Sequence, residues 1–407
     1  GDNMLELENK YIDLLLKRCL NLKKSTSLFI SYDKTCDDFV KKLVSRAKEL
    51  GYSDIYEDCS DIFYLKNKLM NSSLDEIEND PYYDKSIWDK YAEKKANFLM
   101  LETEFPGVMD GVDSKKLGLA KSVNRKTRTL FRHLETTYQI PWCIAAIPNK
   151  IWADKIFPNS EDSYKELFLV ICKMCMVDRE DPIKSWNDFM IKSKGDIDWL
   201  NSLKIKGLHY TNEIGTDLKI EMPKEYSWSG LTDDLKNEMI VNMPSYEIFA
   251  SPNYKKTEGI IVSSKPLYYG GGLIENFYLK FKDGKVIDFN AEKGRELLKS
   301  IIESDENSCY LGEVALVNFD SPISNTGLVF GTTLFDENAS CHLALGAGFP
   351  TTIPNGANLS REELLELGIN SSSNHVDFMI GTSDLKIEAE TKNGKQLIFK
   401  NGNFVSH

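Results

Sequence analysis

The chain has 407 residues, 42% of them hydrophobic and 28% charged, so it is long enough for two or three domains that each bury a core. Its net charge of −12 argues against a nucleic-acid binder or a protein held on an anionic membrane, because both need a basic face. No run of 18 or more apolar residues occurs, and the eight cysteines are scattered rather than spaced as a disulfide framework. We therefore expect a globular protein of the reducing cytoplasm.

The first half of the chain alternates helical patterns with short apolar runs. We predict helices over residues 4–22, 35–50, 115–137, 162–176 and 181–202, and strands over 27–31, 54–56, 96–101 and 142–147. Strand–helix–strand repetition at this spacing predicts a mainly parallel sheet with helices on its faces. No GxGxxG or Walker glycine loop opens any of these helices, so the pattern gives no support to nucleotide binding.

The second half is richer in strands. We predict strands over residues 204–210, 216–222, 258–269, 273–281, 286–289, 314–319, 385–390 and 396–400, and helices over 292–304 and 338–345. Asp283-Gly284 and Asn393-Gly394 are typical hairpin turns. The prediction is an α/β amino-terminal domain over residues 1–225 and an α+β carboxy-terminal domain, with an antiparallel-rich sheet, over residues 226–407.

Cys172 and Cys175 form a CxxC pair, which is one half of a zinc or redox motif. The pair lies inside a strongly apolar helical run over residues 166–176, and no second CxxC or neighbouring histidine completes a tetrahedral site. We interpret both residues as buried helix cysteines.

Acidic residues interrupt apolar stretches four times between residues 247 and 377, and two of the five histidines lie in the same part of the chain. Charged side chains are rarely buried unless they are paired or bound to a cation, so these interruptions indicate a shared counter-charge. The residues concerned are Glu247, Glu313, Glu337, His342, His375 and Asp377.

His375 and Asp377 form the most informative pair. Strand alternation directs both side chains to one face, while Val376 and Phe378 face the core. An imidazole and a carboxylate two residues apart on a rigid strand suit a metal ion.

Glu337 and His342 are five residues apart, about 140° around an ideal helix, which differs from the spacing of an HExxH zincin. We expect Glu337 at the start of the predicted helix and His342 within it. Satisfied core histidines and carboxylates on a solvated face fit the same residues, whereas four carboxylates with two imidazoles suit two divalent cations better than one.

The ordered motifs of the second half resemble the thermophilic-type metallo-aminopeptidases, the family of aminopeptidase T and aminopeptidase S. The resemblance runs over about 200 residues, and the first half agrees in length and style with fewer distinctive motifs. The matching segments are residues 208–210, 215–218, 242–244 with Glu247, 264–267, 269–271, 291–294, 311–317, 320–323, 333–339, 342–346 and 375–381.

The resemblance implies a cytoplasmic homodimer that removes amino-terminal residues from peptides by means of a water activated by two metal ions. It places the metal ligands at Glu247, Glu313, Glu337, His342, His375 and Asp377. Zinc or cobalt is the expected metal, with magnesium or manganese as alternatives. Glu313 is our candidate for the residue that orients or deprotonates the water, and Glu337 is the competing candidate.

Phe349 departs from the family pattern, which commonly has a tyrosine at the end of this motif with its hydroxyl in the active site. If that hydroxyl stabilises the tetrahedral intermediate, its absence costs on the order of 10²-fold in rate. The alternatives to an aminopeptidase are a two-metal amidase acting on a non-peptide substrate and a non-catalytic, metal-stabilised peptide-binding protein.

Overall fold

The computed structural model describes residues 2–231, 238–269 and 272–407, so the glycines at 270 and 271 of the motif over residues 269–271 lie outside the described residues. The chain divides into two compact units, described separately below. The first unit comprises Gly1–Asn187 and Asp234–Pro244, and the second comprises Asp188–Asp233 and Ser245–His407.

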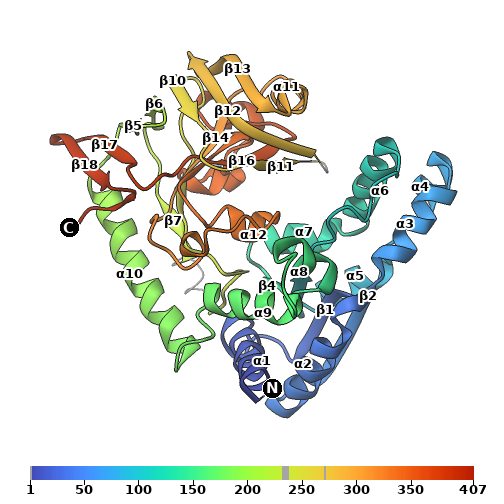
Figure 1. Ribbon diagram of the computed structural model, residues 1–407. Helices are drawn as coiled ribbons and strands as arrows, with labels where there is room; N and C mark the ends of the chain where they lie inside the picture. Colours follow the sequence, from blue (N-terminus) through green and yellow to red (C-terminus); the bar gives the residue numbers. More distant parts are fainter. Residues whose placement is uncertain (1, 232–237, 270–271) are drawn as a thin grey trace. The chain divides into compact units, whose positions relative to one another are not determined.

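The first unit is built on a parallel sheet with the strand order β2-β1-β3-β4-β8, which confirms the predicted mainly parallel sheet. Figure 1 labels β1, β2 and β4 of this sheet. Strand β1 is buried along most of its length, as expected for a strand in a parallel sheet that is covered on both faces. The strands are β1 (Ser27–Asp33), β2 (Asp54–Ser60), β3 (Asn97–Glu102), β4 (Trp142–Ala146) and β8 (Asn242–Met243).

Local signals set the limits of the helices in this unit. Helix α2 ends at Gly51, whose φ of 113° is a left-handed conformation that glycine adopts without strain. Helix α4 begins with a capping box between Ser73 and Glu76. The helices are α1 (Asp2–Leu14), continued by a π-helical turn (Leu15–Cys19), a 3₁₀ turn (Lys34–Cys36), α2 (Asp37–Leu50), α3 (Ile62–Asn71), α4 (Leu74–Asn79), α5 (Lys85–Glu93), α6 (Ser114–Thr127), α7 (Thr129–Thr136), α8 (Lys150–Ile156) and α9 (Ser163–Met174).

The single helix predicted over residues 115–137 is wrong, because the chain breaks at Arg128 into α6 and α7. The hydroxyls of Thr127 and Thr129 donate to the carbonyls of Asn124 and Lys126, and such bonds compete with the regular helix ladder. The guanidinium of Arg128 lies 4.4 Å from the ring centroid of Tyr83.

Cys172 lies in the last turn of α9, within the predicted helical run, and Cys175 directly follows the helix. Both are buried, and all eight cysteines of the chain are free thiols. Among the described residues, the groups whose side-chain atoms are close enough to share a metal ion contain no cysteine. The interpretation of Cys172 and Cys175 as buried helix cysteines therefore fits the structure.

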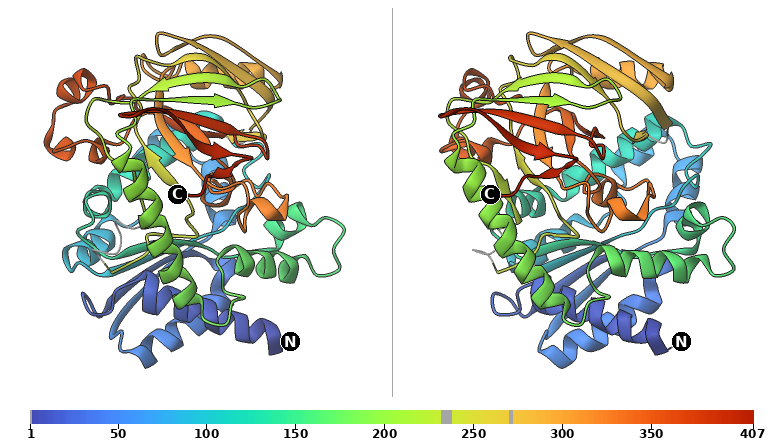
Figure 2. Two further views of the ribbon diagram at one scale, coloured as in Figure 1. Left: turned by 90° about the vertical axis from the view of Figure 1, so that its left-hand side faces the viewer. Right: turned by 60° about the vertical axis from the view of Figure 1, so that its left-hand side comes forward.

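The second unit contains a large antiparallel sheet, which confirms the antiparallel-rich prediction. Its strand order is β11-β12-β10-β6-β5-β17-β18-β19, with β13 paired to β12. Figure 2 shows the red strands β17 and β18 beside the green hairpin of β5 and β6. The strands are β5 (Gly207–Thr211), β6 (Asp217–Glu221), β10 (Glu258–Val262), β11 (Leu267–Tyr269), β12 (Gly272–Lys282), β13 (Lys285–Lys293), β17 (Lys386–Thr391), β18 (Gly394–Lys400) and β19 (Asn403–Phe404).

A second antiparallel sheet of this unit, which we call the site sheet, has the order β16-β15-β14-β9-β7. Its strands are β7 (Ser229–Gly230), β9 (Ile248–Ala250), β14 (Leu311–Leu316), β15 (His342–Gly346) and β16 (His375–Met379). The helical segments are α11 (Arg295–Ile302), α12 (Thr333–Asp336), α13 (Arg361–Glu366) and 3₁₀ turns at Ser324–Thr326, Pro350–Thr352 and Gly356–Asn358.

The limit between the units falls within helix α10 (Pro182–Ser202). Strands β5 and β6, which the sequence placed in the amino-terminal domain, pair with β17 and β10 of the second unit. The two compact units do not show which parts of the chain fold independently, so the predicted domain boundary between residues 225 and 226 remains a prediction. Within the described part of the chain, no helix has both the length and the apolar character to cross a membrane.

Candidate metal centre

The site sheet has two chemically different faces. Side chains at alternating positions of β14, β15 and β16, among them Val314, Leu343 and Phe378, belong to the hydrophobic core of the second unit. The residues between them point to the opposite face. All six predicted metal-site residues gather on that side: Glu247 just before β9, Glu313 on β14, Glu337 after α12, His342 on β15, and His375 and Asp377 on β16.

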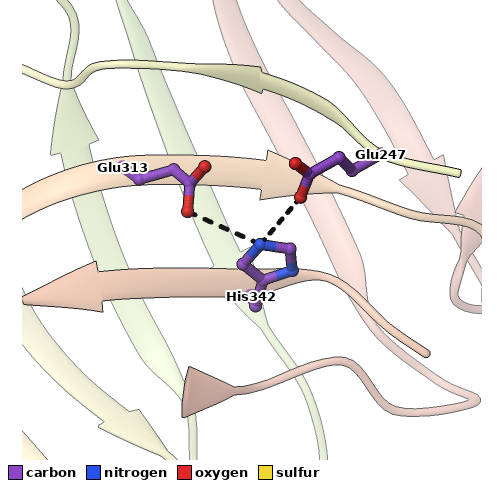
Figure 3. A group of neighbouring side chains, drawn as sticks. All are labelled: Glu247, Glu313 and His342. Carbon is purple, nitrogen blue, oxygen red and sulfur yellow. Dashed lines mark ion pairs between the residues drawn. The ribbon is translucent and has the colours of Figure 1, made fainter. Parts of the chain in front are cut away.

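Glu247, Glu313 and His342 form the first group (Figure 3). Nε2 of His342 lies 3.0 Å from Oε2 of Glu247 and 3.5 Å from Oε2 of Glu313. The imidazole is completely buried and the Glu313 carboxylate is 4% exposed. Two carboxylates, one just before β9 and one on β14, therefore converge on one ring nitrogen, at a place with almost no access to water.

His375 and Asp377 share one face of β16, as the alternation predicted. Nε2 of His375 lies 3.3 Å from Oδ1 of Asp377 and 3.7 Å from Oε2 of Glu313. One ligand atom from each of Glu313, His375 and Asp377 lies within 4.8 Å of the others, and the same holds for Glu337, His342 and Asp377. The six residues thus form overlapping groups rather than separate ion pairs.

Several polar atoms of this cluster have no hydrogen-bond partner among the described residues, although they are buried. They are Oε2 of Glu247, Nε2 of His342 and Oδ1 of Asp377. These atoms lie within ion-pair distance of one another, 3.0 Å for Glu247 and His342 and 3.3 Å for Asp377 and His375, without forming hydrogen bonds. Buried polar atoms normally find partners, and this arrangement is the one that ligands of a bound cation adopt.

Backbone carbonyls hold both imidazoles by their other ring nitrogen. Nδ1 of His342 lies 3.2 Å from the carbonyl oxygen of Ser340, and Nδ1 of His375 lies 2.8 Å from that of Ala347. A carbonyl can only accept, so Nδ1 carries the proton and Nε2 faces the carboxylates. This orientation is typical of histidines that bind metal through Nε2.

Glycines allow the strands to approach at this site. The pairing of β14 with β15 shifts register between Leu311 and Glu313. A Cβ atom on Gly312, between them, would lie 2.2 Å from the carbonyl oxygens of Gly346 and Ala347. Only glycine therefore lets the Ala347 carbonyl that orients His375 lie against the strand that carries Glu313.

The predicted helix over residues 338–345 is wrong. Glu337 follows the last residue of α12 rather than opening a helix, and His342 is the first residue of β15. Every residue of β15 is buried because the strand lies between β14 and β16. A short, wholly apolar run has the same pattern in a buried strand and in a buried helix, so periodicity could not separate them.

Burial and neighbouring charges shift the acidities of the cluster strongly. Burial and the nearby Asp377 raise the pKa of Glu313 to about 7, and burial with the nearby Glu247 raises the pKa of Glu337 well above its usual range. Burial would lower the pKa of His375, but the neighbouring carboxylates of Asp377 and Glu313 outweigh it and raise the pKa to about 11. Burial would raise the pKa of Asp377, but the neighbouring His375 outweighs it and lowers the pKa, so the shifts within the cluster run in both directions, as is common where several titratable groups are buried together at a functional site.

Phe349 lies directly against this cluster. Its ring centroid is 5.2 Å from that of His375 and 5.1 Å from that of Phe249. The residue that departs from the family pattern is therefore in contact with one of the two imidazoles.

Comparisons with known proteins agree with this geometry. The family model of the thermophilic metalloprotease (M29) matches residues 5–404. The chain belongs to this family. It is 35% identical to aminopeptidase AmpS of Bacillus subtilis over 99% of this chain and 100% of that protein, and 34% identical to aminopeptidase 2 of Geobacillus stearothermophilus over 98% and 97%. The structure of wild-type AmpT from Thermus thermophilus superimposes with a TM-score of 0.88 at 27% identity, covering 98% of this chain and 99% of that chain.

Membership of the thermophilic metalloproteases confirms the predicted resemblance and the predicted class of enzyme, a metallo-aminopeptidase. The similarity to the structure of AmpT also confirms the predicted fold class, in which one chain contains a part with a parallel sheet and a part rich in antiparallel sheets. The family implies a divalent metal, and the overlapping groups on the site sheet offer nitrogen and oxygen atoms for one.

Sequence reasoning missed the parts of this metalloprotease that position the ligands. It did not identify the carbonyls of Ser340 and Ala347, the requirement for glycine at residue 312, or the side-chain amide of Asn338, whose oxygen accepts from the backbone N–H of Tyr246 next to Glu247. Leu311-Gly312-Glu313 was the one available signal, because a glycine inside a strand pattern often marks a bulge.

Proposed function

We propose that this chain removes amino-terminal residues from peptides with the help of two divalent cations held on the polar face of the site sheet. The observation that carries the proposal is the convergence of four carboxylates and two imidazoles, several of whose buried polar atoms have no hydrogen-bond partner among the described residues; the six groups belong to Glu247, Glu313, Glu337, His342, His375 and Asp377. Aminopeptidases that match along almost the whole chain support the reaction type.

The overlap of the groups supports two cations rather than one. Glu247 and His342 would hold one cation, His375 and Asp377 would hold the other, and Glu313, which belongs to both groups, would contact both. The mixed nitrogen and oxygen donors suit zinc or cobalt, while a site for magnesium would use oxygen ligands almost alone. When bound, such cations polarise a carbonyl and lower the pKa of water.

The remaining carboxylate of the cluster, Glu337, is our candidate for the general base. It would accept a proton from the attacking water and return it to the amine that leaves when the peptide bond breaks. This order reverses the one expected from the sequence, because Glu313 belongs to two of the ligand groups and Glu337 to only one, which makes Glu313 the weaker candidate. The four carboxylates also suit a substrate with a positively charged free amino terminus.

A peptide panel tests this proposal against its alternatives. The protein is incubated with a short peptide and with the same peptide acetylated at its amino terminus, before and after treatment with a chelator and after metal is restored. We expect release of the first residue from the free peptide only, loss of release with the chelator, and recovery with zinc or cobalt.

Other outcomes would decide against an aminopeptidase. Cleavage of the acetylated peptide at the same rate would favour the two-metal amidase. Full metal binding without release from any peptide would favour the non-catalytic peptide-binding protein.

We also propose that the chain works as a homodimer in the cytoplasm. The eight free cysteines support a reducing compartment. Light scattering coupled to size-exclusion chromatography tests the dimer, which a mass of about 46.4 kDa for the whole population would contradict.

A further inference from the structure

Asp305, in the connection between α11 and β14, accepts an unusually large number of hydrogen bonds for a surface carboxylate. Its Oδ2 accepts from the backbone N–H of Ser373 at 2.8 Å and from the Ser373 hydroxyl at 2.9 Å. Its Oδ1 accepts from the hydroxyls of Ser308 and Ser372, both at 2.9 Å, and from the backbone N–H of Asn307 at 3.0 Å. One carboxylate thus ties the segment 372–373 to the loop that precedes β14.

A continuous series of hydrogen bonds leads from this carboxylate to His375. The Ser372 hydroxyl, which donates to Asp305, accepts from the backbone N–H of Asn374 at 3.0 Å. The carbonyl of Asn374 accepts from the N–H of Ala347 at 2.8 Å. The carbonyl of Ala347 accepts in turn from Nδ1 of His375, also at 2.8 Å.

The surrounding backbone leaves little room for this segment to move. The Asn370 side-chain amide donates to the carbonyls of Gly346 at 2.7 Å and Asn307 at 2.9 Å, so three loops are joined at one place. A Cβ atom on Gly346 would lie 2.1 Å from the carbonyl oxygen of Asn374. A shift of the segment 372–374 would therefore displace the Ala347 carbonyl or the imidazole that it orients.

We propose that Asp305 is a positioning residue for the metal centre. It fixes the start of β16 so that Nδ1 of His375 stays bonded to Ala347 and Nε2 faces Glu313 and Asp377. A carboxylate fits this place because each of its oxygens accepts from a backbone N–H, whereas the amide of an asparagine would turn its own N–H group toward the backbone N–H of Asn307 or of Ser373. The inference rests on the proposed function only in assuming that His375 binds a metal.

Asp305→Asn tests the proposal, and Asp384→Asn is its matched control. Asp384 also accepts from a hydroxyl, that of Thr382 at 2.6 Å, and from a backbone N–H, that of Glu213 at 2.8 Å, but it lies after the other end of β16. Both variants lose an acceptor of the same kind in the same unit, so both should become less stable. Only Asp305→Asn should disturb the position of His375.

The readouts are metal affinity, measured by competition with a chelator using zinc alone, and the visible absorption spectrum of the cobalt-loaded protein. We expect Asp305→Asn to weaken zinc binding by about 10- to 100-fold and to change the cobalt spectrum, as loss of an outer partner of a ligand does. Asp384→Asn should leave both at wild-type values. Unchanged affinity and spectrum in folded Asp305→Asn would overturn the proposal.

Ser372→Ala serves if Asp305→Asn does not fold. It removes the hydroxyl that links Asp305 to Asn374 and retains the carboxylate, so a smaller change in the same direction is expected and wild-type values would again overturn the proposal. Because these measurements use no substrate, a wild-type protein that binds zinc but releases no amino acid would refute the proposed function and leave the positioning role intact.

Discussion

The same strands form both faces of the site sheet, because successive side chains of a strand point to opposite faces, and the two faces differ in chemical character. Toward the core, Val376 and Phe378 are buried among apolar side chains, while on the other side His375 and Asp377 meet carboxylates from neighbouring strands. Burying a carboxylate costs several kcal/mol unless charge or hydrogen bonds compensate it. The apolar face therefore supplies the stability that keeps the charged face assembled, and the two faces should respond differently to substitution.

The largest expected effect distinguishes Glu337 from Glu313, the two candidates for the general base on the charged face. We expect Glu337→Gln to keep more of its metal than Glu313→Gln, because Glu337 belongs to one ligand group, and to lose about 10²- to 10⁴-fold in kcat, because a base contributes about that much. Glu313→Gln should lose metal as well as activity, because Glu313 belongs to two ligand groups. Metal analysis and steady-state kinetics measure both.

Glu390→Gln, on an exposed position of β17, is the control and should match the wild type in both measurements. A Glu313→Gln variant that retains both metals and full activity would show that Glu313 is neither a ligand nor the base.

The next largest effect concerns the apolar face. Phe378 is 2% exposed and its ring centroid lies 5.9 Å from that of Phe277. We expect Phe378→Ala to lower the free energy of unfolding by about 3–5 kcal/mol while the folded protein keeps the wild-type number of bound metal ions. Urea denaturation measures the first quantity and metal analysis the second. Tyr268→Ala, at a side chain that is 48% exposed, should cost less than about 0.5 kcal/mol.

Replacing Phe349 with tyrosine tests whether the charged face lacks a hydroxyl that would assist catalysis. Since its ring already contacts His375, Phe349→Tyr should fold normally and add a donor beside the site. We expect kcat to rise by up to about 10²-fold, the usual contribution of one donor to a tetrahedral intermediate. If kcat and KM stay at wild-type values, a tyrosine hydroxyl has no part in this enzyme's mechanism.

The smallest effect is a pH dependence of stability at the loops that support the charged face. Burial alone would raise the pKa of Asp305, but hydrogen bonds from Ser373, Ser372 and Ser308 outweigh it and hold the pKa well below its usual range. A group whose pKa is lower in the folded protein stabilises it above the unfolded pKa of about 3.9, and this stabilisation disappears as the pH falls toward the folded value. The difference in Tm between the wild type and Asp305→Asn should thus be constant from about pH 5 to 7 and narrow below about pH 4.

Much of the fold and of the site could be predicted from the sequence, because both depend on short-range patterns. The alternation over residues 375–378 indicated which side chains share a face, and Asp283-Gly284 and Asn393-Gly394 marked hairpins that the structure contains. The six residues of the cluster were recognisable because acidic residues and histidines are rare inside apolar runs.

The remaining features depend on contacts that no local pattern records. His342 belongs to a strand because β14 and β16 flank it, and its apolar neighbours would look the same in a buried helix. Asp305 is 70 residues before His375 in the chain, and only the folded loops bring its carboxylate to Ser373. Such positioning groups appear in sequence as ordinary loop residues.

The shift in register at Gly312 has a consequence for anyone who redesigns this protein. Replacing strand glycines with residues of higher β-propensity is a common route to greater stability. At this position even one methyl group would meet two carbonyl oxygens, and the strand that yields would carry Glu313 away from both histidines. A substitution that stabilises other strands would here displace the residues of the site and lower activity. Residue 312 should therefore be excluded from libraries that aim only at thermal stability.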